Sequence, residues 1–198
     1  MRFRFFGTEI YISFLFSAVI AFMIATDRTG LVIPTLFSVL LHEVGHLIFM
    51  WIFECEPKSI KLVPASISIT RGMSAKKYGD LLISLAGPMV NLIMFCSLYV
   101  NFLITKSAFS LDCALINLAF FTFNMLPVSG LDGGTVLKII LSKKFKDPLK
   151  AERIVRIITL AVGLLVGIIG ITLIINGELN ISVFIVAIYI IISAFIRI

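Results

Sequence analysis

Long apolar stretches alternate with short polar segments along almost the whole 198-residue chain. A bilayer core about 30 Å thick is crossed by roughly 20 apolar residues in a helix. Stretches of about this length predict six membrane-spanning helices, at 10–26, 31–53, 81–105, 113–131, 157–177 and 179–196. The pattern therefore predicts an all-α polytopic membrane protein. The first stretch lacks a signal-peptide cleavage site, so we expect it to be retained as a helix.

Between the second and third predicted spans, the continuous apolar pattern changes to an alternation of apolar and polar residues. Residues 59–70 are rich in β-branched side chains that alternate with polar ones, and the run ends at Arg71-Gly72. Such alternation indicates a strand, with Pro64 as a candidate hinge for a hairpin. Lipid-exposed strand edges are not tolerated in hydrocarbon. We therefore expect a short β-hairpin or strand near residues 58–72, at the cytoplasmic side or in a protein-lined cavity.

Composition and charge agree with a membrane protein. Hydrophobic residues make up 60% of the chain and charged residues only 14%, whereas soluble domains carry about a quarter. The net charge of +6 comes from basic residues before the first span, at 58–77, at 138–156 and at Arg197. The other loops contain only two basic residues, Arg28 and Lys106. The positive-inside rule then places both termini in the cytoplasm. Nucleic acid is not expected as a partner, because the charges lie in short loops beside the bilayer.

His42-Glu43-Val44-Gly45-His46 interrupts the second predicted span and contains both histidines of the chain. Residues four apart on a helix share a face, so His42 and His46 could present imidazole nitrogens to one point. This H-E-x-x-H spacing is typical of zinc sites in which the glutamate, here Glu43, acts as a general base on metal-bound water. Ionisable groups at bilayer depth usually mark a functional site. The alternative is a polar packing cluster between membrane helices.

A second polar stretch, at residues 124–134, ends the fourth predicted span. It contains one proline, three glycines and Asp132, which predicts a helix break at a place where backbone lines a cavity. Catalytic zinc commonly takes three protein ligands and a water. Asp132 is therefore the candidate third ligand beside His42 and His46. A glycine-rich turn with a solvated aspartate at the interface is the structural alternative.

Two asparagines and the alternating segment supply further candidates for catalysis and for substrate binding. Asn124, just before the predicted break, is the first choice as donor to a developing oxyanion. Asn91, which follows Gly87-Pro88 in the third span, is the second choice, and a kinked helix whose Asn91 bonds a neighbour is equally compatible. An open strand edge could hold an unwound peptide by β-augmentation, or the hairpin could merely cover the site. The substrate-binding candidates are Asn91 and, in the alternating segment, Ser66, Ile67, Ser68 and Ile69.

These motifs resemble the signature motifs of the site-2 protease family of intramembrane zinc metalloproteases. The resemblance rests on His42 to His46, on N-x-L-P-x-x-x-L-D-G-G at 124–134, and on Gly87-Pro88-x-x-Asn91. It implies a three-helix catalytic core and one zinc ion per chain on His42, His46 and Asp132. It also implies cleavage of a transmembrane or membrane-tethered protein near or within the bilayer.

The six-span plan is similar to the stage IV sporulation protein FB branch of that family, which releases a membrane-tethered sigma-factor precursor. This resemblance implies a bacterial cell membrane, a sigma-factor precursor or anti-sigma factor as substrate, and a membrane inhibitor protein as a candidate partner. The chain departs from the branch, since it ends at Ile198 without a CBS domain, and no PDZ insert separates the spans. We expect one protease domain over residues 1–198, with a catalytic core at about 31–134 and C-terminal helices at about 154–198.

Two other functions are compatible with a metal site in the membrane. A metal-ion transporter would ordinarily repeat histidines or acids over several spans, whereas this chain has one cluster. A non-catalytic scaffold stabilised by zinc would keep the three ligands and would have no use for Glu43. The presence of Glu43 favours the protease.

Overall fold

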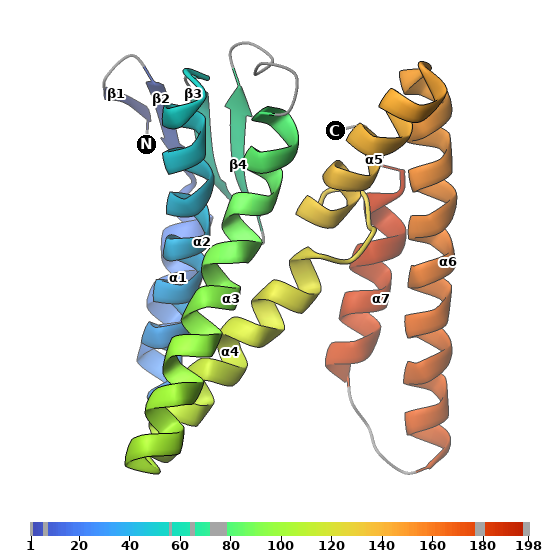
Figure 1. The fold of residues 1–198 in the computed structure, drawn as a ribbon. Helices are drawn as coiled ribbons and strands as arrows, with labels where there is room; N and C mark the ends of the chain where they lie inside the picture. Colours follow the sequence, from blue (N-terminus) through green and yellow to red (C-terminus); the bar gives the residue numbers. More distant parts are fainter. Residues whose placement is uncertain are drawn as a thin grey trace. The chain divides into compact units, whose positions relative to one another are not determined.

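The computed structural model describes residues 2–5, 8–55, 57–63, 66–71, 79–176 and 181–195. Most of these residues are helical, as the apolar pattern predicts. The chain divides into two compact units, residues 1–122 and 123–198. Figure 1 colours both along the sequence, and each is described here by itself.

The first unit contains a four-stranded sheet at one end of its helices (Figure 1). The strands β1 (Arg2–Phe5), β2 (Thr8–Ile12), β3 (Pro57–Val63) and β4 (Ser66–Arg71) lie in that order across the sheet. Strands β2 and β3 are parallel, and the other two pairs are antiparallel. Parallel neighbours need a crossover connection, which the helices α1 (Phe14–Thr26) and α2 (Val32–Ile52) provide.

The alternating segment predicted near residues 58–72 corresponds to β3 and β4. Pro64, the predicted hinge, lies outside the described residues. The predicted start of the first span at residue 10 is wrong, because residues 8–12 form β2 and α1 begins at Phe14. The reason is that the apolar residues of β2 run directly into the apolar helix, so hydrophobicity alone marks no boundary between them.

Within the described residues, an apolar helix overlaps each of the six predicted spans. The fourth, predicted to reach residue 131, ends at Asn124, because Pro127 and the glycines that follow do not continue a helix. Three of them are long and apolar enough to cross a membrane: α2, α3 (Gly79–Thr105) and α6 (Pro148–Ile175). Three are shorter apolar helices: α1, α4 (Ala108–Asn124) and α7 (Ile181–Ser193). A helix needs about 20 residues to cross a bilayer by itself, so the lengths support an integral membrane protein with three helices of full spanning length among the described residues.

The turn between α1 and α2 is held by the carboxylate of Asp27. Its Oδ1 accepts hydrogen bonds from the backbone N–H of Thr29 and Gly30, at 2.9 and 3.0 Å, and its Oδ2 accepts one from Val32 at 3.1 Å. These bonds, the one from Val32 foremost, keep the pKa of the Asp27 carboxyl below its ordinary value. The bond from Val32 also satisfies an N–H group at the start of α2 that has no partner within the helix.

The second unit contains α5 (Asp132–Phe145), α6 and α7. The basic segment 138–156, predicted to be a loop, is helical on both sides of one tight turn. Lys146 ends α5 in the left-handed conformation, and Asp147 caps α6 by accepting hydrogen bonds from the backbone N–H of Leu149 and Lys150. The prediction was wrong because charge density was taken as a loop signal, although Asp147 followed by Pro148 is a helix-start signal.

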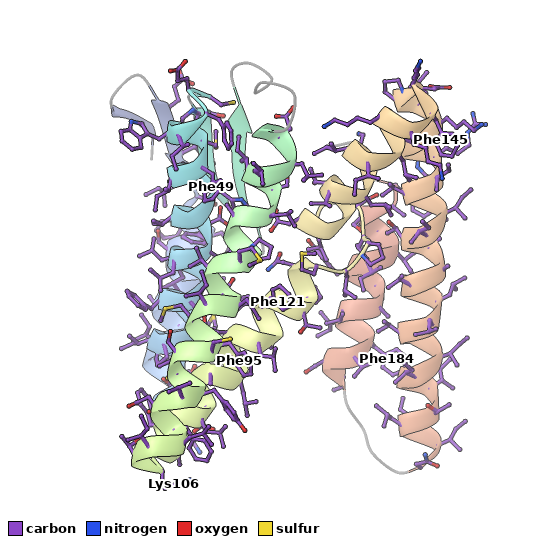
Figure 2. All side chains as sticks on the ribbon, viewed as in Figure 1. Phe49, Phe95, Lys106, Phe121, Phe145 and Phe184 are labelled. Carbon is purple, nitrogen blue, oxygen red and sulfur yellow. The ribbon has the colours of Figure 1, made fainter. Side chains whose placement is uncertain are left out.

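Glycines of α6 allow close packing against α7. A Cβ added at Gly163 would lie 2.7 Å from Cγ1 of Ile191, and one added at Gly170 would lie 3.2 Å from the ring of Phe184. Phe184 is labelled on α7 in Figure 2. Buried Ile190 of α7 joins Val128 and Leu131 in a core cluster. This cluster anchors the segment that leads into α5.

Candidate active site

Helix α2 presents its two histidines to one point. His42 and His46 are both buried, and their Nε2 atoms are 3.2 Å apart. The rings meet edge to face, with centroids 4.8 Å apart. This is the arrangement expected of residues four apart on a helix face, and it brings together the two histidines that the sequence predicts as ligands.

The other nitrogen of each ring is hydrogen-bonded within the first unit. Nδ1 of His42 lies 2.6 Å from Oδ1 of Asn91, and Nδ1 of His46 lies 2.7 Å from the backbone oxygen of Ile83. A carbonyl oxygen can only accept, so both Nδ1 atoms carry the proton and donate it. With Nδ1 protonated, a neutral ring presents its lone pair at Nε2, which is the tautomer that a metal-ligating histidine needs.

The spacing and protonation of the histidine pair fit a zinc ion. The two Nε2 atoms are 3.2 Å apart. When both rings are neutral, a cation between them can accept both lone pairs. Nitrogens bound to tetrahedral zinc at about 2.0–2.1 Å are about 3.3 Å apart, close to the separation observed here.

Gly87 of α3 leaves open the space in front of the two histidines. A Cβ added at this position would lie 2.3 Å from Nε2 of His46 and 2.7 Å from Nε2 of His42. Gly45 has a similar role in α2, where an added Cβ would lie 3.0 Å from the backbone oxygen of Ala86. The two glycines therefore allow α2 and α3 to approach closely with the Nε2 atoms accessible. Sequence reasoning noticed Gly87 within a recurrent motif and assigned it no role.

Asn91 extends the histidine network into α4. Its side chain is fully buried, and its Nδ2 donates to Oδ1 of Asn117 at 3.0 Å and to the backbone oxygen of Ser38 at 3.3 Å. Nδ2 of Asn117 in turn donates to the backbone oxygen of Cys113 at 2.9 Å. Asn117 was missed by sequence reasoning, because a single asparagine in an apolar span gives no sign of its partner. This network favours a role for Asn91 in positioning His42.

Glu43 follows His42 on α2 and is half-buried. The neighbouring position on a helix is rotated by about 100°, since one turn holds 3.6 residues. Glu43 is therefore on the same helical turn as the first histidine without sharing its direction. That placement suits a group that acts on a water near the histidines rather than one that joins them as a ligand.

Asn124 and Asp132 lie at the two ends of the predicted helix break, in the second unit. Helix α4 ends at Asn124, and α5 begins at Asp132 after a turn in which the backbone N–H of Val128 donates to the oxygen of Leu126 at 2.8 Å. Asp132 is half-buried in the first turn of α5, where the helix dipole favours a carboxylate. The predicted break between these two residues is confirmed.

Gly133 and Gly134 are required by the fold of this turn. An added Cβ would lie 2.3 Å from the backbone oxygen of Met125 at position 133, and 2.0 Å from that of Val128 at position 134. Thr159 of α6 fixes the turn from the other side, since its hydroxyl accepts a hydrogen bond from the backbone N–H of Ser129 at 2.9 Å. The turn thus holds Asp132 on a rigid support, and Thr159 is a supporting residue that the sequence motif did not include.

The predicted substrate-binding residues Ser66, Ile67, Ser68 and Ile69 lie in β4. Within the described segments, β4 pairs with β3 alone and ends the order of strands in the sheet. Asn91, predicted as a further substrate contact, has both atoms of its amide group engaged in hydrogen bonds inside the first unit.

Comparisons with known proteins point in one direction. The family model of peptidase family M50 matches residues 105–168, which include the turn at 125–131. A zinc metalloprotease of Methanocaldococcus jannaschii is 29% identical over 147 residues, which are 69% of this chain and 43% of that protein. The chain thus spans less than half the length of this curated relative. A solved structure of a site-2 protease from the same organism matches with a TM-score of 0.73 and 26% identity, and the match covers 100% of this chain and 97% of that chain.

All three matches support the site-2 protease (M50) family. They also support a metalloprotease. An M50 protein is expected to use zinc and to act on membrane proteins. The donor set of His42 and His46 agrees with zinc, as their spacing and tautomers indicate.

Proposed function

We propose that this chain is an intramembrane zinc metalloprotease that hydrolyses a peptide bond of a transmembrane or membrane-associated protein, near or within the bilayer. One observation carries the proposal: two buried imidazoles with protonated Nδ1 atoms and Nε2 atoms 3.2 Å apart, one residue away from a glutamate. Neither a transporter nor a scaffold needs a general base at that place.

In this proposal His42, His46 and Asp132 hold one zinc ion. Two neutral imidazoles and one carboxylate are a common ligand set of catalytic zinc. When bound, zinc supplies a Lewis acid that makes water more acidic and polarises the substrate carbonyl. With Glu43 also ionised, the charges of the ion and the two carboxylates cancel, which lowers the cost of placing them in low dielectric.

The remaining chemistry belongs to the side chains of the chain itself. Glu43 accepts a proton from the attacking water at its carboxylate and delivers that proton to the nitrogen of the leaving amine. The amide of Asn124 donates a hydrogen bond to the oxygen on which negative charge develops. Asn91 holds His42 in the correct tautomer, and β4 holds the substrate in an extended conformation by main-chain hydrogen bonds.

The finer assignments rest on the sequence. We propose that all six apolar helices cross the membrane, that both termini face the cytoplasm of a bacterial cell, and that residues 1–198 act as one protease domain with its core at about 31–134. A sigma-factor precursor or an anti-sigma factor is the substrate class that the branch resemblance suggests, and a membrane inhibitor protein is the matching candidate partner.

The test is single-turnover cleavage of a labelled transmembrane peptide by the purified protein, with and without a zinc chelator. Cleavage should stop with chelator and return when zinc is added back. Glu43→Gln should keep its zinc and lose turnover, because an amide cannot act as a base. Glu54→Gln, at an exposed position just after α2, is the matched control and should cleave normally. Cleavage by Glu43→Gln at the unmutated rate would rule out the proposed role of Glu43.

Zinc content separates the ligand proposal from the catalytic one. Alanine at His42, His46 or Asp132 should lower bound zinc well below one ion per chain, because each substitution removes a ligand. Full zinc occupancy in Asp132→Ala would remove Asp132 from the metal site and would leave the histidine pair in place.

A further inference from the structure

The second unit contains a cavity of about 280 Å³ lined by both polar and apolar groups. Its walls come from the turn before α5, the first half of α5, α6 and the end of α7. The lining residues are Ser129, Gly130, Gly134, Thr135, Lys138, Glu152, Val155, Arg156 and Ala194. Two hydroxyls and three charged groups thus face one small space.

The three charged groups of the cavity are arranged with one acid between two bases. Nζ of Lys138 lies 3.1 Å from Oε2 of Glu152, and a guanidinium nitrogen of Arg156 lies 3.8 Å from Oε1. The second distance is longer than a hydrogen bond, so the planar group of donors on Arg156 can turn to another anion. All three side chains are partly exposed, at 39%, 36% and 39% for Lys138, Glu152 and Arg156, so a ligand can reach them.

The depth of the cavity follows from the charge pattern of α6. Arg156 is the last charged residue of this helix, and residues 157–175 carry no charge. At 1.5 Å per residue this run is about 28 Å long, close to the thickness of the hydrocarbon core. Arg156 therefore marks the boundary between hydrocarbon and headgroups, where lipid phosphates lie. Further basic residues at 143–153 increase the attraction for anions on this side.

We propose that this cavity binds the phosphate group of an anionic ligand, one that has no cation of its own to cancel the phosphate charge. Arg156 and Lys138 donate hydrogen bonds to the phosphate oxygens, and the hydroxyls of Ser129 and Thr135 add to them. Arginine and lysine are the side chains that bind phosphate most strongly. Glu152 competes with the ligand for the same two cations. The bound group touches Gly134 and Thr135, which belong to the first turn of α5, the turn that carries Asp132.

The phosphate group could belong to a lipid headgroup or to free inorganic phosphate, and one experiment separates the two sources. The detergent-purified protein is titrated with phosphatidylglycerol, with phosphatidylcholine and with inorganic phosphate, and bound molecules are counted by native mass spectrometry. Tight binding of one phosphatidylglycerol supports a lipid source. Binding of phosphate alone supports a free anion. If phosphatidylcholine binds as tightly as phosphatidylglycerol, or if none of the three binds, the proposal is wrong.

Variants locate the binding in the cavity. Arg156→Gln and Lys138→Gln should each weaken binding roughly tenfold or more, since each removes a charged donor. Arg153→Gln is the matched control, because Arg153 is exposed on α6 and does not line the cavity. It removes the same charge from the long-range attraction alone, so its loss of affinity should stay well below tenfold. Glu152→Gln should tighten binding by removing the competing carboxylate, a gain that misfolding cannot produce. Equal loss in Arg153→Gln, or no gain in Glu152→Gln, would overturn the assignment.

Discussion

Oδ1 of Asn91 accepts a hydrogen bond from Nδ1 of His42 at 2.6 Å, and this contact links the histidine pair on α2 to a buried amide network on α3 and α4. Both ends of the Asn91 amide are engaged, because its Nδ2 donates to Asn117. The contact fixes the His42 proton on Nδ1 and directs the Nε2 lone pair toward His46. Asn91 therefore acts through His42 as a positioning residue.

We expect Asn91→Ala to weaken zinc binding by about 10–100-fold, the usual effect of removing the hydrogen-bond partner of a metal-ligating histidine. Asn91→Asp should largely restore the affinity, because a carboxylate also accepts from Nδ1. The measurement is competition for zinc with a metal-sensitive dye. Asn101→Ala is the matched control, since Asn101 also joins α3 to α4, through a 2.8 Å bond to Ser110, and has no bond to a histidine. A similar loss of zinc in Asn101→Ala would mean that helix packing alone is responsible.

Gly87→Ala tests the space in front of the histidines. The added Cβ would lie 2.3 Å from Nε2 of His46, so zinc content should fall far below that of the unmutated protein while the helix content by circular dichroism is kept. Gly167→Ala is the control, because its Cβ would have Ala187 at an ordinary 4.0 Å. Full zinc occupancy in Gly87→Ala would show that α3 can move away from α2 at little cost.

The sequence predicted the ligand-bearing helix and the helix break well, because both depend on local patterns. His42 and His46 meet at helical spacing, and a proline with three glycines ends α4 where expected. The supporting contacts could not be predicted in this way. The carbonyl of Ile83 and the amide of Asn117 reach the site through the packing of α3 and α4, which no periodicity in a single chain reveals.

Strands β1 and β2 were missed for a different reason. Strand β2 pairs with β3, which lies about 50 residues further along the chain, and β1 joins the sheet through β2. Long-range pairing of this kind leaves little trace in local composition. The α5–α6 hairpin was missed although its signals were local. The left-handed Lys146 and the cap residue Asp147 lie within a run of lysines that suggested a cytoplasmic loop.

Asn124→Ala should act on catalysis rather than on the metal. The variant should retain zinc and lose on the order of 10²-fold in kcat with KM nearly unchanged, the usual consequence of removing one oxyanion donor. Single-turnover rates at saturating substrate measure this directly. If KM rises and kcat stays, Asn124 binds the substrate in its ground state, and the oxyanion role assigned to it would be wrong.

Topology can be tested with single cysteines in a background that lacks Cys55, Cys96 and Cys113. Lys144→Cys, near the end of α5, should react with a membrane-impermeant reagent only from the cytoplasmic side. Lys106→Cys, in the turn after α3, should react only from the opposite side. Labelling of both positions from one side would contradict the arrangement with six crossings.

The position of β4 at the end of the strand order makes it the natural place for an added strand. In the pairing with β3, Ile67 lies opposite Leu62 and Ser68 opposite Lys61. Backbone N–H groups of an antiparallel strand point to the two sides alternately. The N–H groups of every second residue of β4 therefore bond to β3. The N–H groups of the residues between them are directed to the side on which a substrate would pair.

The effect of a proline substitution in β4 on cleavage should consequently alternate from one residue to the next, because proline removes one backbone donor. The residues form two pairs, Ser66/Ser68 and Ile67/Ile69, and the N–H groups of one pair point away from β3. Proline at either residue of that pair should abolish cleavage and leave the zinc content normal. The other pair should mainly weaken the pairing with β3 and lower cleavage less. Alanine at the same four positions controls for loss of the side chains. If all four prolines leave cleavage intact, or all four remove zinc, β4 is a structural cover and does not bind substrate as a strand.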